Sequence, residues 1–298
     1  MDVLEIQNLK KSFGGKEVLC GVDLSVPEHS VFGFIGKNGS GKTTTMKAVL
    51  GLLRPDSGRI SVMGEKVRFG QTETNRYIGY LPDVPEFYSY MTPIEYLTLC
   101  GEVGGLEKSD IAARSKELLE LVGLGRERRR IKSFSRGMKQ RLGIAQALLN
   151  RPRLLICDEP TSALDPAGRK EILDILLAAR EQTTVLFSTH ILSDVERICT
   201  EAAFLNNGKI AMQGTIAQLR SKRSSDGFII ETEHKAAADT LVKAFGDLQR
   251  TEQNALVFQG GEDRLYAVMR YIAENRMSVQ RIERIEPTLE SLFLEVTR

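Results

Sequence analysis

Residues 36–43, GKNGSGKT, are the most informative stretch of this sequence. They match the pattern G-x-x-x-x-G-K-[ST] and follow a β-type run, VFGFI (31–35). An amphipathic helix, TTTMKAVLGLL (43–53), comes next, so the pattern stands at the strand-to-helix turn where it has structural meaning. Successive backbone N–H groups of such a loop face phosphate oxygens. The stretch therefore predicts a nucleotide-binding site.

Each residue type in this loop has a chemical reason. Three glycines allow the backbone to curl tightly, the lysine reaches the β- and γ-phosphates, and the threonine hydroxyl can ligate Mg²⁺. The alternative is an accidental glycine-rich turn, which the flanking strand and helix argue against. The nucleotide-binding residues predicted from the loop are Gly36, Lys37, Asn38, Gly39, Ser40, Gly41, Lys42, Thr43 and Thr44.

A second apolar run, in RLLICDEP (153–160), ends in two carboxylates. Buried parallel strands deliver such side chains to the carboxyl edge of the sheet, where ligands bind. We predict that Asp158 helps to hold Mg²⁺ and that Glu159 accepts the proton of the water that attacks the γ-phosphate. The alternative is a pair of acids that cap a strand and bind cations.

A second candidate anion site lies at FSRGMKQR (134–141). Ser135 is the expected N-cap of a helix, and cations stand around the first turn. Free N–H groups and positive charge at a helix N-terminus favour an anion. These residues alone do not say which anion binds there.

Helical and strand patterns along the chain indicate an α/β frame with an inserted helical block at about 84–135. A polar stretch, RSKRSSDG (220–227), is the expected linker. Beyond it the order βαββαβ, with a final helix TLESLFLEVTR (288–298), indicates a small α+β module of the ferredoxin-like type.

Composition limits the possible functions. The chain has 298 residues with 41 basic and 39 acidic side chains, so its net charge of +2 gives no global reason to expect nucleic acid. The 4 cysteines lack metal-ligand spacing and indicate reduced thiols. The sequence shows neither a signal-peptide pattern nor an apolar run of about 20 residues. If the protein functions at a membrane, we expect it to lie outside the bilayer.

The quoted motifs, in this order, resemble the ATP-binding subunit of an ABC (ATP-binding cassette) transporter over about residues 1–220. The resemblance implies a P-loop NTPase cassette, with a RecA-like core, an N-terminal antiparallel β subdomain and a helical subdomain at about 84–135. Residues 221–298 would be an accessory domain. The motif at 134–141 stands where the family has its L-S-G-G-Q signature, which binds the γ-phosphate of ATP held by the other subunit of a head-to-tail dimer. The signature residues carried over are Ser135, Arg136, Gly137 and Met138.

Three further positions are carried over from the resemblance. SALD (162–165) matches the D-loop, so Asp165 would connect the two sites across the dimer, and His190 matches the switch histidine at the γ-phosphate. Together with Glu159 and Lys42, His190 completes the predicted catalytic set. Phe13 matches the aromatic residue that stacks on adenine, with a core or turn aromatic as its rival interpretation.

Asp83 departs from the family pattern, because the family usually has glutamine at this joint between frame and helical block. We consider it a coupling-hinge residue and a possible metal ligand, or else a plain turn residue before Pro85. The run RERRR (126–130) is either a solvated face or a contact with a partner. The ending EPTLESLFLEVT resembles that of cassettes that serve exporters of the ABC-2 type.

The predicted function is that of an ATPase, with ATP and Mg²⁺ as cofactors, that couples dimer closure to export by separate transmembrane permease subunits. We expect a homodimer or a heterodimer with a related ATPase, in the cytoplasm on the inner face of the cell membrane. The main alternative is a soluble ABC-type ATP switch on nucleic acid or a protein assembly. A sensing or immunity role beside a membrane partner is a further one.

Overall fold

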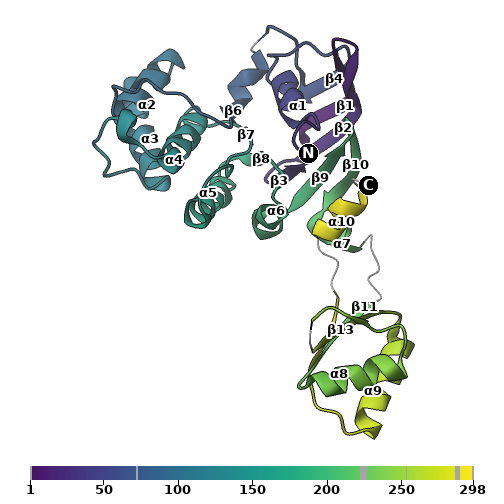
Figure 1. Ribbon diagram of the computed structural model, residues 1–298. Coiled ribbons are helices and arrows are strands. Elements are labelled where there is room, and N and C mark those ends of the chain that lie inside the picture. Colours follow the sequence, from purple (N-terminus) through teal and green to yellow (C-terminus); the bar gives the residue numbers. More distant parts are fainter. Residues whose placement is uncertain (1, 72, 222–226, 253, 286–288, 297–298) are drawn as a thin grey trace. The chain divides into compact units, whose positions relative to one another are not determined.

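The computed structural model describes residues 2–71, 73–221, 227–252, 254–285 and 289–296, and it divides the chain into two compact units (Figure 1). The first contains residues 1–216 and Val296, and the second contains 217–295. The boundary between them lies at the start of a short helix, α7 (Ile216–Ser221), a few residues before the expected linker. Most of that linker falls on 222–226, outside the described residues.

A six-stranded sheet forms the centre of the first unit, in the order β10-β9-β3-β8-β7-β6. The five strands from β9 to β6 are parallel, and only β10 runs antiparallel to its neighbour. Continuous apolar runs form β3, β7 and β8 and are buried along their whole length, as expected for parallel strands covered on both faces. The bounds are β3 Val31–Ile35, β6 Ile78–Leu81, β7 Leu154–Cys157, β8 Thr184–Thr189, β9 Glu201–Asn206 and β10 Lys209–Thr215.

Two groups of elements lie against this sheet. The helices α1 (Lys42–Val49), α5 (Pro166–Ala179) and α6 (Leu192–Ile198) follow β3, β7 and β8 in the chain. An antiparallel sheet in the order β2-β1-β4-β5 shares a hydrophobic core with β3 and α1. Its strands are β1 Asp2–Phe13, β2 Lys16–Pro27, β4 Ser57–Val62 and β5 Glu65–Lys66, and η1 (Glu73–Tyr77) leads from them to β6. The predicted α/β frame and antiparallel β subdomain are confirmed.

The helical block is inserted between β6 and β7 and stands to one side of the sheet (Figure 1). It contains α2 (Pro93–Val103), α3 (Lys108–Leu121), the short helix η2 (Ile131–Ser133) and α4 (Arg136–Leu148). A capping box fixes the start of α2: the Thr92 hydroxyl accepts from the Glu95 backbone N–H, and the Glu95 carboxylate accepts from the Thr92 backbone N–H. The contacts of α4 with β6 connect the block to the sheet.

The second unit has the predicted ferredoxin-like topology. Its elements are β11 (Gly227–Thr232), α8 (Lys235–Ala244), β12 (Gln249–Arg250), β13 (Ala255–Gln259), α9 (Glu262–Glu274) and β14 (Val279–Arg284). The strands form one antiparallel sheet in the order β12-β13-β11-β14. The order follows from two βαβ halves whose strands interleave, so that each helix returns to the same face. The expected final helix is α10 (Leu289–Val296) within the described residues, while 288, 297 and 298 lie outside them.

Candidate functional site

The glycine-rich loop connects β3 to α1 and depends on glycine at two positions for different reasons. Gly41, the N-cap of α1, has φ 108°, in the left-handed region that other residues avoid. A Cβ on Gly36 would lie 2.5 Å from Ser40 Oγ and 2.8 Å from the Leu205 carbonyl oxygen. The loop therefore curls tightly over the start of α1 because no side chain obstructs it.

Lys42 begins α1, and its ammonium group is held inside this loop. Its Nζ donates to the carbonyl oxygen of Gly36 at 2.7 Å, and the side chain is only 6% exposed. The same Nζ lies 3.0 Å from Oε1 of Glu159. The lysine charge is thus placed at the loop and is neutralised by a carboxylate from the loop after β7.

Asp158 follows β7 and has two hydroxyl partners. Thr43 Oγ1 donates to Asp158 Oδ2 at 2.7 Å, although the two residues are 115 positions apart. Ser188 Oγ, from the neighbouring strand β8, donates to Oδ1 at 2.7 Å. The predicted metal-binding residues Thr43 and Asp158 therefore lie in contact. The Asp158 carboxylate is buried, and a hydroxyl group binds each of its two oxygens.

Glu159 lies between a lysine and a histidine. Besides the Lys42 ion pair, its Oε2 lies 2.9 Å from Nδ1 of His190, which follows β8. Its backbone N–H donates to Ser188 Oγ at 2.9 Å, and its φ of 48° is unusual for a residue other than glycine. Such strain persists only where the surroundings fix it, and here they aim the carboxylate into the cleft.

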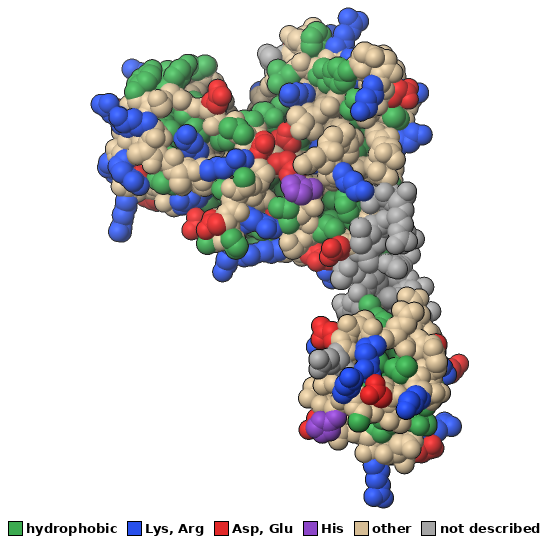
Figure 2. Space-filling model, in the orientation of Figure 1, with side chains coloured by type: hydrophobic (Ala, Val, Ile, Leu, Met, Phe, Trp, Pro, Cys, Tyr) green, Lys and Arg blue, Asp and Glu red, His purple; other side chains and the backbone are tan. Residues whose placement is uncertain are grey.

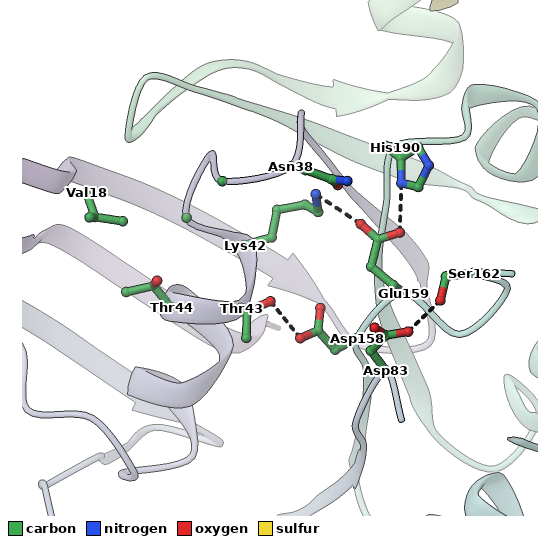
Figure 3. A pocket seen from close by; sticks show the side chains of 12 residues that line it. Val18, Asn38, Lys42, Thr43, Thr44, Asp83, Asp158, Glu159, Ser162 and His190 are labelled. Carbon is green, nitrogen blue, oxygen red and sulfur yellow. Dashed lines mark hydrogen bonds and ion pairs between the residues drawn. The ribbon is translucent and has the colours of Figure 1, made fainter. Parts of the chain in front are cut away.

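These groups line one open cleft of about 360 Å³ (Figure 3). Acidic side chains gather in this hollow, beside a histidine (Figure 2). Of the residues predicted for the site, the cleft contains Asn38, Gly39, Gly41, Lys42, Thr43, Thr44, Asp83, Asp158, Glu159 and His190. The predicted Lys37 and Ser40 line a second pocket, which shares Asn38 and Gly39 with the cleft.

The geometry combines a phosphate-binding loop, a hydroxyl–carboxylate pair for a hard cation, and a carboxylate–histidine pair beside them. The sequence model of the ABC transporter family matches residues 19–162. The uncharacterized ABC transporter ATP-binding protein YxlF of Bacillus subtilis is 43% identical over 234 residues, which is 78% of each chain. The bacitracin transport ATP-binding protein BcrA of Bacillus licheniformis is 34% identical over 305 residues, 99% of this chain and 97% of the relative. The chain belongs to the ATP-binding subunits of ABC transporters.

The fold agrees with this assignment. A solved ATP-binding subunit of an ABC transporter superposes with a TM-score of 0.66 at 33% identity, over 74% of this chain and 92% of the other. The cassette therefore binds ATP and belongs to a family that hydrolyses it in transport. Among the described helices, none is both long and apolar enough to cross a membrane.

The residues carried over as the signature lie at the first turn of α4. Ser135 is the N-cap, as predicted, and its hydroxyl accepts from the Met138 backbone N–H at 3.2 Å. Gly137 lies close to the loop between β7 and α5, since a Cβ on Gly137 would be 3.8 Å from Leu164 Cδ2. Asp165 caps α5 by accepting from the Gly168 N–H at 3.2 Å. None of the four signature residues, nor Asp165, lines the cleft of its own chain.

Phe13 lies at the end of β1, in the hairpin with β2, and is 47% exposed. Its ring is not part of the cleft wall; the Lys11 ammonium lies 5.2 Å from the ring centroid. The rival interpretation of Phe13 as a core residue disagrees with this exposure. Adenine stacking stays a prediction.

Asp83, the residue that departs from the family pattern, has an ionic partner. The guanidinium of Arg136 lies 3.2 Å from Asp83 Oδ1, and the hydroxyl of Ser162 donates to the same oxygen. The Asp83 carboxylate faces the cleft and is bound by residues of its own chain (Figure 3). Metal binding by Asp83 stays a prediction that must compete with this ion pair.

Three residues of the site were missed by sequence reasoning: Val18 and Ser162 in the cleft wall, and Ser188 behind the carboxylates. Val18 carries no local signal, because an apolar strand residue is common everywhere, whereas Ser162 is the first residue of the SALD match, from which only Asp165 was carried over. Ser188 could have been found, since it lies two residues before His190 on the strand beside β7. Alternate strand residues share a face, and neighbouring parallel strands end at the same edge.

Burial around the site also changes the pKa values of side chains on the strands next to it. Burial, with the negative charge of Asp158, raises the pKa of Tyr80 on β6 to about 12. Burial raises the pKa of the Cys157 thiol well above its usual range, so this cysteine is an inert member of β7.

Within the described residues, no cluster of three or more His, Cys, Asp or Glu side chains forms a metal site.

Proposed function

We propose that this cassette hydrolyses ATP with Glu159 as the general base, and that two cassettes in a head-to-tail dimer drive export through separate membrane subunits. The single observation that carries the proposal is the chain of contacts from Lys42 through Glu159 to His190, beside the Thr43–Asp158 pair, in one cleft. These contacts bring together a phosphate-binding cation, a base and an orienting imidazole.

The residues present are suited to Mg²⁺. The Thr43 hydroxyl and the Asp158 carboxylate already lie 2.7 Å apart, and both are hard oxygen ligands of the kind that Mg²⁺ takes. We assign the metal-binding role to this pair, directly or through water. When bound, Mg²⁺ neutralises charge that develops on the β- and γ-phosphate oxygens.

The proposed reaction uses this chain's groups in sequence. Lys42 leaves Glu159 and binds the β- and γ-phosphates, which frees the carboxylate. A water oxygen then attacks the γ-phosphorus in line, its proton passes to Glu159, and the bond to the bridging oxygen of ADP breaks. His190 keeps the carboxylate oriented and contacts the γ-phosphate. Phosphate and ADP leave, and Glu159 returns its proton to solvent.

The second ATP contact is assigned to the partner subunit. Ser135 and Arg136 are exposed at the N-terminus of α4, where free N–H groups favour an anion. In the proposed dimer, the residues from Ser135 to Met138 of one cassette contact the γ-phosphate on the other, and Asp165 lies between the two sites. Closure of the dimer would complete each site, and hydrolysis would reopen it.

The proposed contact with the membrane subunits lies beside Asp83. A groove of about 450 Å³ is lined there by residues that include Val84, Phe87 and Arg136. Exposed apolar and aromatic side chains continue along the same segment, with Val84, Tyr88 and Tyr90 each more than half exposed. Surface apolar patches of this kind mark interaction sites. This contact would hold the chain peripherally at the inner face of the membrane.

A transport role is supported by the similarity to a bacitracin transport ATP-binding protein, and the resemblance of the ending to that of ABC-2 exporter cassettes favours export. A soluble switch acting on nucleic acid is not favoured, because two relatives are named bacitracin transport ATP-binding proteins and the net charge is only +2.

A pull-down tests the proposal. Tagged Glu159→Gln is incubated with ATP and Mg²⁺ and recovered from gently solubilised membranes of the source cells, and bound proteins are identified by mass spectrometry. We expect a stoichiometric polytopic partner, since the variant retains ATP and stays closed. Recovery of ribosomal or other soluble proteins instead, with no membrane protein, would refute the transport assembly.

A further inference from the structure

Three segments that are far apart in the sequence meet at Asp83. Nη2 of Arg136, at the start of α4, donates to Asp83 Oδ1 at 3.2 Å and to Ser162 Oγ at 3.0 Å. Ser162 belongs to the loop after β7 and donates its own proton to Asp83 Oδ1. The three side chains form a closed triangle, here called the Asp83 triangle.

The backbone of Asp83 is fixed as well. Its carbonyl oxygen accepts from Nε2 of Gln140 at 2.6 Å, and Gln140 is fully buried one turn after Arg136 on α4. Helix α4 therefore holds Asp83 twice, through its carboxylate and through its carbonyl. The start of α4 is coupled to the nucleotide cleft through this residue, since Asp83 lines the cleft and Arg136 does not.

Ser162 connects the triangle to the general base. The loop from Glu159 to Asp165 contains two non-glycine residues in the left-handed region, Glu159 with φ 48° and Ala163 with φ 52°. Such conformations persist only where neighbouring contacts fix them. The Ser162 backbone N–H donates to the Glu159 carbonyl oxygen at 3.0 Å, and the Ser162 side chain is bound by Arg136 and Asp83.

The other side of this loop is anchored independently. The Thr161 hydroxyl donates to the buried carboxylate of Asp194 at 2.8 Å, and Asp194 is paired with Arg169. These contacts hold the loop against α5 and α6. The side that faces the cleft is held by the Asp83 triangle, in which Arg136 supplies the only cationic group.

We propose that Arg136 acts within its own chain as a positioning residue for ATP hydrolysis. By binding Ser162 and Asp83 together, its guanidinium fixes the strained loop that begins at Glu159 and so keeps the base aligned on the attacking water. This inference rests on the proposed function, because it takes Glu159 as the base. It adds a role in cis to a residue otherwise assigned only to the partner's ATP.

The expected kinetic effect is specific. Arg136→Ala lowers kcat about five- to tenfold, because a misaligned base affects the transition state and not the bound ATP. The affinity of the same chain's cleft for ATP stays within about twofold, because the phosphate loop and Lys42 are untouched. Arg136→Lys keeps the charge but loses the planar fork that reaches two acceptors, so it recovers only part of the rate.

A double-mutant cycle tests the proposal in the full-length protein. Steady-state ATPase rates are measured for Arg136→Ala, Ser162→Ala and the double variant, with Arg128→Ala as the control. Arg128 is an exposed arginine of the same helical block whose guanidinium donates to the backbone carbonyls of Gly125 and Glu127, so its removal should leave the rate unchanged. Circular dichroism melting establishes that each variant is folded.

The cycle separates the two roles of Arg136. If it acts through Ser162, the double variant is no slower than the slower single variant, because the shared contact is lost once. If Arg136 acts only on the ATP of a partner subunit, the two rate losses multiply, and the inference is overturned. Lack of ATP hydrolysis by the unaltered protein would instead refute the proposed function itself.

Discussion

The ammonium of Lys42 and the carboxylate of Glu159 form an ion pair of 3.0 Å across the nucleotide cleft, and both side chains are largely buried. In this arrangement Lys42, which would bind the γ-phosphate, forms an ion pair with Glu159, which would activate the water. ATP therefore has to exchange one anionic partner of Lys42 for another. In the proposed mechanism, Glu159 would become free to act as the base only when the phosphates have bound Lys42, which would limit proton transfer to the ATP-loaded site.

Lys42→Ala should abolish measurable ATP binding and also destabilise the nucleotide-free protein. Removing one partner of a buried ion pair leaves a charge without compensation, which costs about 3 kcal/mol of the free energy of unfolding. Urea unfolding measures this loss, and isothermal titration calorimetry measures ATP binding. The double variant Lys42→Ala with Glu159→Gln is the control, since it removes the uncompensated charge. If the double variant regains no stability, the ion pair is not the cause.

Asp158→Asn should raise the Mg²⁺ concentration needed for half-maximal ATPase rate by at least about tenfold, because an amide is a weaker ligand than a carboxylate. Asp83→Asn is the matched comparison. We expect it to shift the Mg²⁺ dependence less than about twofold, because the Asp83 carboxylate is already bound to Arg136. Equal shifts in both variants would show that Asp83 contributes to Mg²⁺ binding as much as Asp158 does.

Phe13→Ala should raise the KM for ATP about tenfold if the exposed ring stacks on adenine, since base stacking on an aromatic side chain is worth roughly 1–3 kcal/mol. Phe13→Tyr should keep the wild-type KM because it keeps the π-face. Phe69→Ala removes a comparably exposed phenylalanine elsewhere and serves as the control. A KM unchanged in Phe13→Ala would contradict adenine stacking.

Alkaline pH should destabilise the fold partly through Tyr80. Its pKa is raised from the ordinary 10.0 to about 12 by burial and by the charge of Asp158, so folding favours the neutral phenol. This contribution is complete below pH 10 and is lost as the pH rises toward 12.

The Tyr80 effect can be measured by urea unfolding at pH 8 and pH 11. Tyr80→Phe should lose less stability between these two values than the unaltered protein, because no phenol ionises at this position. Tyr266→Phe, at an exposed tyrosine of the second unit, is the control. An unaltered slope in Tyr80→Phe would refute the assignment of this titration to Tyr80.

Much of the fold could be predicted from local patterns. The strand VFGFI, the glycine loop and the helix after it are recognisable because backbone hydrogen bonding and turn geometry depend on residues close in sequence. The N-cap at Ser135 was predictable for the same reason, as its hydroxyl binds an N–H three residues away. The ferredoxin-like order of the second unit followed from its alternating elements.

The structure brings predicted site residues together where a motif fixed both the residue and its place on a sheet edge. Asp158 and His190 both follow strands that proved to be parallel neighbours, so their convergence on the cleft could be expected. Asp83 illustrates the limit of such reasoning. Its departure from the family pattern was visible, but its partner was not, since Arg136 is 53 positions away.

The sequence by itself determined the nucleotide-binding loop, the order of the elements and the family, because these depend on short-range geometry and on the identity of residues within a motif. Only the tertiary structure decided that Lys42 pairs with Glu159 and that Arg136 binds Asp83 and Ser162. Contacts of this kind depend on strand order, on helix packing and on side-chain rotamers. None of these is set by local periodicity, because they are fixed only when distant segments pack together.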